Sequence, residues 1–137
     1  MLPLYVSDVP LSCIKTVAIE YHLPAALIIS VLNIERGKIG MISKNKNNSY
    51  DIGPMQINSL WLDDLKRYGI NQHDLQYDPC INVRVGAWIL SKAIASGSDL
   101  LAGVGDYHSH TPTNNASYNQ RVRINFTKIQ ILLKDRD

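Results

Sequence analysis

The sequence predicts a mainly α-helical single compact domain of about six helices, with a small irregular or β-like segment near the middle of the chain. The 137 residues are 45% hydrophobic and 19% charged, which suits one hydrophobic core. Apolar residues recur at helical spacing along most of the chain, and prolines, glycines and capping side chains divide this pattern into segments of helix length. We expect residues 1–137 to form one domain, with an irregular N-terminal segment over residues 1–10.

The N-terminal part of the chain predicts two helices separated by a proline. A first helix over about 11–21 is indicated by side chains at helical spacing, namely Cys13, Val17 and Tyr21. Pro24 suits the first residue of a second helix with the sequence ALIISVLNIE, which ends near 36–37. Because this second helix is apolar nearly all round, we expect it at the centre of the fold.

The middle of the chain predicts a loop followed by a helix. Residues 37–50 are rich in Gly, Ser, Asn and Lys, a composition typical of loops. A third helix through Lys66 follows, because either Asn58 or Ser59 can cap its first turn and Gly69 can close it.

Three more helices are expected in the C-terminal half. Asp78-Pro79 opens a helix that Gly97 ends, and a short helix follows over about 99–105. After a polar loop over 109–116, the last helix carries apolar residues on one face: Tyr118, Val122, Phe126, Ile129 and Leu133.

Charge and hydropathy exclude several classes of protein. The formal net charge is +2, and the Lys and Arg residues are scattered, whereas a nucleic-acid binding face needs a basic stripe. No segment approaches the roughly 18 apolar residues of a membrane span. We therefore expect no nucleic-acid partner, no membrane span and a monomer. The start, MLPLYVSDVPLSC, lacks the basic residues and long apolar stretch of a signal peptide, so an export signal either was removed or is replaced by another route.

Metal, cofactor and nucleophile chemistry have little support in the sequence. His108 and His110 could face the same way on an extended segment. No third ligand has suitable spacing, although zinc sites use three or four. No Gly-x-Ser-x-Gly elbow is present either. We expect neither a metal nor a cofactor.

The two cysteines, Cys13 and Cys80, allow two interpretations. They could be buried free thiols, since free cysteines are often buried. They could equally form one disulfide between two helices, which would be natural in an oxidising compartment.

Glu35 lies at the end of the very apolar second helix, next to a glycine-bearing loop. Apolar surroundings disfavour the charged form of a carboxylic acid, and a general acid working near neutral pH needs that environment. A solvated glutamate in a final helical turn is the ordinary alternative. That position is unfavourable, because the C-terminal end of a helix is itself negative.

The segment from Tyr50 to Asn58 reads Tyr-Asp-Ile-Gly-Pro-Met-Gln-Ile-Asn. Its glycine permits close backbone approach, and its two amide side chains can donate to and accept from hydroxyl and acetamido groups. A turn followed by a helix cap is the structural alternative, which fits Asn58 better than Gln56.

This segment resembles the Gly-Leu-Met-Gln signature of the lytic transglycosylases, in the lysozyme-like superfamily. In that family the signature follows a helix that ends in the catalytic glutamate, the position of Glu35 here. Residues 103–109, Gly-Val-Gly-Asp-Tyr-His-Ser, look like the family's Ala-Tyr-Asn-Ala-Gly segment, and Tyr118 resembles a tyrosine of its final motif. The resemblance extends from Cys13 to about Phe126 and implies a lysozyme-like α+β fold.

The chain is most similar to a small subgroup that serves conjugation, type IV secretion and type IV pilus systems, with related type III secretion enzymes. The similarity covers the Asn-Asn-Ser-Tyr-Asp-Ile-Gly stretch, Asp78-Pro79-Cys80-Ile81-Asn82-Val83 and Gly86-Ala87-Trp88-Ile89-Leu90. Because this subgroup commonly pairs two such cysteines, the resemblance implies a Cys13–Cys80 disulfide. It also implies a location in the periplasm or cell envelope of a bacterium, where components of such a machine would be partners.

Several positions depart from the family pattern, including residues 114–117 (Asn-Asn-Ala-Ser), where larger relatives carry an acidic residue. Arg36-Gly37 follows the glutamate where many relatives have Ser, Pro54 replaces the usual Leu, and His108 stands where most relatives have Asn. These departures leave the glutamate itself intact.

The resemblance implies a mechanism in which Glu35 acts twice on peptidoglycan glycan strands. It first protonates the glycosidic oxygen between N-acetylmuramic acid and N-acetylglucosamine, and then removes a proton from the muramic C6 hydroxyl, which forms a 1,6-anhydro sugar. The residues implied to hold the substrate are Gly53, Met55, Gln56, Asn58, Tyr107 and Tyr118.

Two rival functions are a lysozyme-like hydrolase and a non-catalytic wall-binding adaptor. Ordinary glycosidases use two carboxylates, for which Asp51 and Asp106 are the candidates here. We expect Asp51 to stabilise its turn and Asp106 to lie near a helix end. An adaptor would lack the acid, and Glu35 is present.

Overall fold

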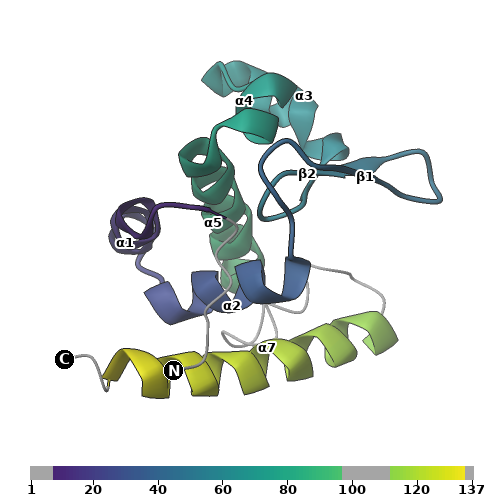
Figure 1. Cartoon of the computed structure of the whole chain (residues 1–137). Coiled ribbons are helices and arrows are strands. Elements are labelled where there is room, and N and C mark those ends of the chain that lie inside the picture. Colours follow the sequence, from purple (N-terminus) through teal and green to yellow (C-terminus); the bar gives the residue numbers. More distant parts are fainter. Residues whose placement is uncertain (1–7, 97–111, 135–137) are drawn as a thin grey trace.

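A computed structural model describes residues 8–96 and 112–134 of the chain (Figure 1). In these residues helices predominate and are accompanied by a small three-stranded antiparallel sheet, which confirms the predicted fold class. The helices are α1 (Leu11–Glu20), α2 (Ala25–Glu35), α3 (Leu62–Leu65), α4 (Gln72–Tyr77), α5 (Pro79–Ser96) and α7 (Pro112–Lys134). The strands are β1 (Ile42–Lys44), β2 (Tyr50–Ile52) and β3 (Ile57–Asn58), and two 3-10 turns are η1 (Ser59–Trp61) and η2 (Lys66–Tyr68).

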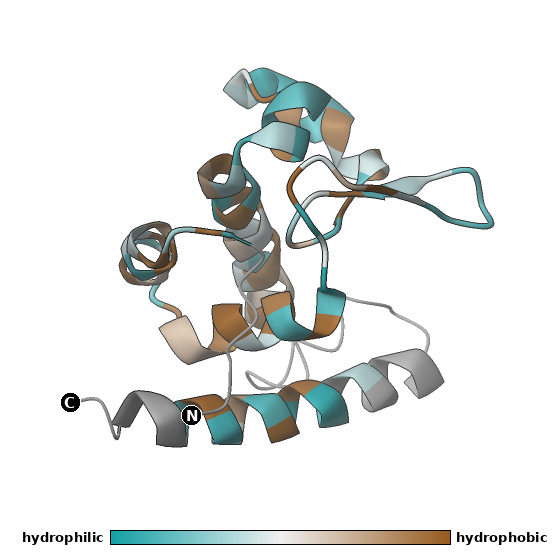
Figure 2. Ribbon diagram, in the orientation of Figure 1, coloured by the Kyte–Doolittle hydropathy of each residue, from teal (hydrophilic) through white to brown (hydrophobic). Residues whose placement is uncertain are grey.

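Helix α2 lies at the centre, as its composition predicts. Its seven successive residues 26–32 are all buried. Helix α2 packs against α7 and α1, and Figure 1 shows α7 running alongside it. Figure 2 shows hydrophobic residues concentrated on α2 and hydrophilic ones at the tip of the hairpin that β1 and β2 form. A helix that is apolar on every side must be surrounded, so it fixes the position of the glutamate at its end.

The structure corrects several sequence-based boundaries. Residues 37–50 were expected to be a loop, but β1 lies within them. Helix α4 was not expected, although Asn71 and Asp74 form a capping box at its start. The last helix begins at Pro112, inside the expected polar loop. The short helix expected over 99–105 and residues 1–7 of the N-terminal segment lie outside the described residues.

The expected third helix is a succession of short turns. Asn58 caps its start by accepting the N–H of Leu60, and Gly69 ends it in a left-handed conformation with φ of 72°. Between these two residues the chain changes from a 3-10 turn to one turn of α-helix and back. Both predicted end signals are therefore confirmed, while the expected continuous helix is wrong.

The register of the sheet separates a buried face from a polar one. Ile52 pairs with Ile57 across β2 and β3, and both side chains are buried. The neighbouring pair, Asp51 with Asn58, faces the opposite way because side chains alternate along a strand. The sheet thus presents a carboxylate and an amide together on the face turned away from the core.

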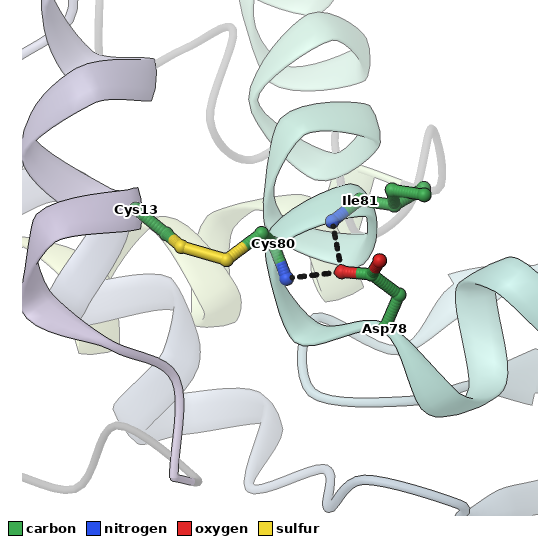
Figure 3. Close-up of a disulfide and its surroundings, with 4 residues drawn as sticks. All are labelled: Cys13, Asp78, Cys80 and Ile81. Carbon is green, nitrogen blue, oxygen red and sulfur yellow. Dashed lines mark hydrogen bonds between the residues drawn. A yellow bond between two sulfur atoms is a disulfide. The ribbon is translucent and has the colours of Figure 1, made fainter.

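A disulfide joins Cys13 of α1 to Cys80 of α5, with the two Cα atoms 5.5 Å apart (Figure 3). The pairing implied by the family resemblance is confirmed. Beside it, the Asp78 carboxylate accepts the N–H groups of Cys80 and Ile81 at 3.0 and 3.1 Å, which caps the start of α5. The cross-link spans 67 residues of sequence and therefore restricts a large part of the unfolded chain.

Replacing both cysteines, as Cys13→Ser with Cys80→Ser, is expected to lower the free energy of unfolding by up to about 4 kcal/mol. The cause is the added freedom of the unfolded chain, and urea denaturation under oxidising conditions measures it. Reducing agent should destabilise the wild type to the same level and leave the double variant unaffected. Equal denaturation midpoints for both proteins without reducing agent would show that the bond contributes nothing.

Candidate active site

A cleft of about 410 Å³ lies between the end of α2, the β1–β2 hairpin and α5. Carboxylates and amides form most of its polar wall, and an indole and two isoleucines provide apolar surface. The lining residues are Glu35, Asn45, Lys46, Asn47, Ser49, Asp51, Gln56, Ile57, Asn58, Trp61 and Ile89. Residues that are distant in sequence, from the end of α2 to the middle of α5, therefore meet around one hollow.

Glu35 is the last residue of α2, and its half-buried side chain lines the cleft. Arg36 then turns the chain in a left-handed conformation with φ of 53°. Gly37 packs against the backbone of the following motif: a Cβ there would lie 2.8 Å from the Pro54 carbonyl oxygen and closer still to that of Gly53. Gly37, which departs from the family pattern, thus lets the end of α2 touch the turn over residues 53–56.

The fully buried side chain of Asn82 holds that turn in place from α5. Its Nδ2 donates to the carbonyl oxygens of Ile52 and Leu75, both at 2.9 Å, and its Oδ1 accepts the N–H of Met55 at 2.8 Å. Gly53 has φ of 69°, and a Cβ at Gly53 would collide with the Asn82 amide. One side chain therefore satisfies three buried backbone groups and sets the path of the motif.

The Gly-Pro-Met-Gln motif divides into a buried part and a cleft-lining part. Gly53, Pro54 and Met55 are buried, and the Met55 sulfur packs against Gly86 of α5, where any side chain would overlap it. Gln56, with φ of 53°, lines the cleft, and its Nε2 donates to the Gly53 carbonyl at 3.0 Å. Gly53, Met55 and Gln56 were all expected to hold the substrate. The structure places Gln56 in the cleft wall and Gly53 and Met55 beneath it.

A hydrogen-bonded network fixes the part of the cleft wall that Ser49, Asp51 and Asn58 form. The Asn58 Oδ1 accepts the N–H of Leu60 at 2.9 Å, so its Nδ2 is the group that meets Asp51 and Ser49, both at 3.1 Å. The Ser49 hydroxyl in turn donates to Asn47 at 2.6 Å. Asp51 was expected to stabilise a turn, but it lies in the middle of β2 with its carboxylate in the cleft wall.

Of the two tyrosines predicted to contact substrate, Tyr118 is the one that the structure describes. Tyr118 is buried on α7, the helix that packs against α2, and it is not among the residues that line the cleft. Tyr107 lies outside the described residues, as do Asp106 and His108.

Several residues of the cleft were not predicted from the sequence. Trp61 and Ile89 line the cleft, and Asn82 supports it, yet none was singled out as a functional residue. A signal for Asn82 was available, because it shares a helix face with Gly86 and Ile89, where a buried amide needs partners. The sequence held no such signal for Trp61, because its position depends on how a short turn packs.

Residues 8–96 and 112–134 contain no group of three or more His, Cys, Asp or Glu side chains placed to bind a metal. Within the same residues, no helix is both long enough and apolar enough to cross a membrane. The pair His108 and His110 lies outside the described residues.

The chain matches one protein family and several known proteins. The family model described as "Transglycosylase SLT domain" matches residues 12–125. "Invasion protein IagB" of Salmonella typhimurium is 34% identical over 102 residues, which cover 74% of this chain and 64% of that protein. "Peptidoglycan-binding-like protein" of Escherichia coli O157:H7 is 32% identical over 114 residues, or 80% of this chain and 66% of that protein. The matched region thus spans just under two thirds of these relatives.

Gly37→Ala is expected to lower the free energy of unfolding by about 1–3 kcal/mol, because the new methyl group would overlap backbone that cannot move freely. It should also speed hydrogen exchange at the Met55 amide, which the displaced turn would no longer hold against Asn82.

Gly69→Ala is the matched control, since Gly69 has φ of 72° and a Cβ added there would have no neighbouring atom within 4 Å. It should cost only backbone strain, about 1 kcal/mol, without faster exchange at Met55 relative to the rest of the protein. Identical exchange at Met55 in the two variants would refute the contact between α2 and the turn.

Proposed function

The chain belongs to the transglycosylase SLT domain family, and on that basis we propose that it is a peptidoglycan lytic transglycosylase with Glu35 as its catalytic acid and base. The observation that carries this proposal is the position of Glu35: it ends α2 in the wall of a cleft that Gln56 and Asn58 also line. A carboxyl group in the same cleft as amides, which can hydrogen-bond hydroxyl and acetamido groups, is suited to glycoside chemistry.

In the proposed reaction the Glu35 carboxyl first donates its proton to the glycosidic oxygen between N-acetylmuramic acid and N-acetylglucosamine. The bond from that oxygen to the muramic C1 breaks, and the N-acetylglucosamine leaves with the proton. The Glu35 carboxylate then accepts the proton of the muramic C6 hydroxyl, whose oxygen bonds to C1. The product is a 1,6-anhydro sugar, Glu35 is again protonated, and no water is consumed.

The rigid walls of the cleft would orient the strand for these steps. Asn58 is held by three hydrogen bonds and Gln56 by one to the backbone, so their amides are positioned before substrate arrives. The Gly53–Met55 backbone below them, fixed by Asn82, would act through this positioning. Tyr118, buried on α7 beside α2, would support the helix that presents Glu35.

The cellular setting is part of the same proposal. A relative is named an invasion protein and another a peptidoglycan-binding-like protein. The Cys13–Cys80 disulfide suits an oxidising compartment. We therefore place the protein in the periplasm or cell envelope of a bacterium, where it would open the wall locally for a secretion, conjugation or pilus apparatus whose components would be its partners.

A lysozyme-like hydrolase is a second candidate, favoured by one observation. Asp51 lines the same cleft as Glu35, and its Oδ1 is oriented by Asn58. A second carboxylate could act as nucleophile or could stabilise positive charge at C1 while water completes the reaction.

Glu35→Gln is expected to reduce the release of soluble fragments from purified cell walls by about 10²- to 10⁴-fold, because an amide can neither donate nor accept the transferred proton. Glu20→Gln is the matched control: it changes the other glutamate of the chain, which pairs with Arg84 on the surface. Undiminished release by the Glu35 variant would exclude the assigned role.

Asp51→Asn separates the two candidates by rate, because Asn keeps an oxygen that can accept from Asn58 but loses the charge. The lone-glutamate mechanism predicts a fall in kcat of less than about tenfold, since no proton transfer is removed. A loss as large as that of Glu35→Gln, with an unchanged melting temperature, would favour the hydrolase.

A further inference from the structure

Three aromatic rings form a continuous row beside the cleft. Trp61 of η1 meets Trp88 of α5 with ring centroids 5.6 Å apart and planes at 70°. Tyr68 of η2 meets the same Trp88 ring at 5.9 Å and 69°. Both contacts have the edge-to-face geometry that aromatic pairs favour, so the rings hold one another in position. We call Trp61, Trp88 and Tyr68 the aromatic row.

The aromatic row connects two hollows of the surface. Trp61 at one end lines the cleft that contains Glu35. Trp88 and Tyr68 at the other end line a second cavity of about 240 Å³, whose remaining walls are mostly apolar. Its other lining residues are Tyr21, Leu65, Ile70, Arg84 and Val85. A polymer that leaves the cleft past Trp61 would therefore meet Trp88 and Tyr68 next.

Core packing does not account for the outer end of the row. Tyr68 is 60% exposed, and Leu60, beside Trp61 in sequence, is 74% exposed. A cation lies along the row as well: the Lys92 Nζ is 4.5 Å from the centroid of the Trp88 ring and 5.9 Å from that of Trp61. A partly exposed aromatic surface edged by a cation, in which Trp61 and Trp88 are half-buried and Tyr68 is exposed, combines stacking faces with attraction for acidic groups.

We propose that the aromatic row is a second glycan-binding site, which holds the peptidoglycan strand where it leaves the cleft. The inference rests on the proposed function, because the strand in the cleft is the occupant whose continuation the row would meet. Sugar rings would lie on the exposed ring faces, and Lys92 would attract acidic substituents of the strand. Because only a strand longer than the cleft reaches Tyr68, the site adds affinity for long strands and none for short fragments.

Tyr68→Ala tests the site, with Tyr77→Ala as its matched control. Tyr77 is 53% exposed, like Tyr68, but its ring contacts His73 on α4 and lines neither hollow. Each change is made in the Glu35→Gln protein, so that the ligand is not consumed. Calorimetry then gives the Kd for long glycan strands and for a tetrasaccharide fragment of the same strands.

The expected result is a Kd for long strands raised about 3- to 10-fold by Tyr68→Ala, with the tetrasaccharide Kd unchanged and Tyr77→Ala without effect. Tyr68→Phe should bind long strands like the parent, because the ring face carries the contact. Equal Kd values for the two alanine variants, or equal weakening of long and short ligands, would overturn the proposal.

The parent protein separates this inference from the function on which it rests. If the Glu35→Gln parent binds neither ligand, the proposed glycan function fails and the second site falls with it. If the parent binds both ligands equally well, the proposed function stands and the second site alone is refuted. A row that serves a protein partner instead would give this latter result.

Discussion

The buried amide of Asn82 is the interaction on which the cleft depends. It binds the backbone of Ile52, Met55 and Leu75 at once, so it joins α5 to the sheet, the motif turn and α4. On the other side of that turn, Gly37 brings the end of α2 into contact with the Gly53 carbonyl. A buried amide with three partners has one low-energy orientation, so it fixes the turn against which the end of α2 packs.

The sequence motif of the family takes on a physical meaning in this geometry. Gly53 is required by its positive φ and by the Asn82 amide beside it, and Met55 fills the space that Gly86 leaves on α5. Gln56 and Asn58 carry the polar groups into the cleft. The buried residues of the segment therefore support the wall and the others line the cleft, which explains why a short segment can indicate a whole site.

Local sequence patterns predicted much of this structure. They could not predict the features that depend on contacts between residues distant in sequence. The helices α1, α2 and α5, and Glu35 at the end of α2, follow from apolar periodicity and capping residues. The place of Asp51 in the cleft wall depends on its pairing with Asn58 across two strands, which composition cannot reveal. Residues 37–50 look like a loop by composition, yet β1 forms there because β2 offers it partners.

In the proposed mechanism one glutamate serves as acid and then as base, with the substrate's own hydroxyl in place of water. Digestion of purified glycan strands in heavy-oxygen water, followed by mass spectrometry of the new chain ends, tests it most directly. A lone glutamate that acts as acid and base yields 1,6-anhydro ends that carry no heavy oxygen. Reducing ends that carry one heavy oxygen atom each, with no anhydro product, would contradict it and would assign the cleft to a hydrolase.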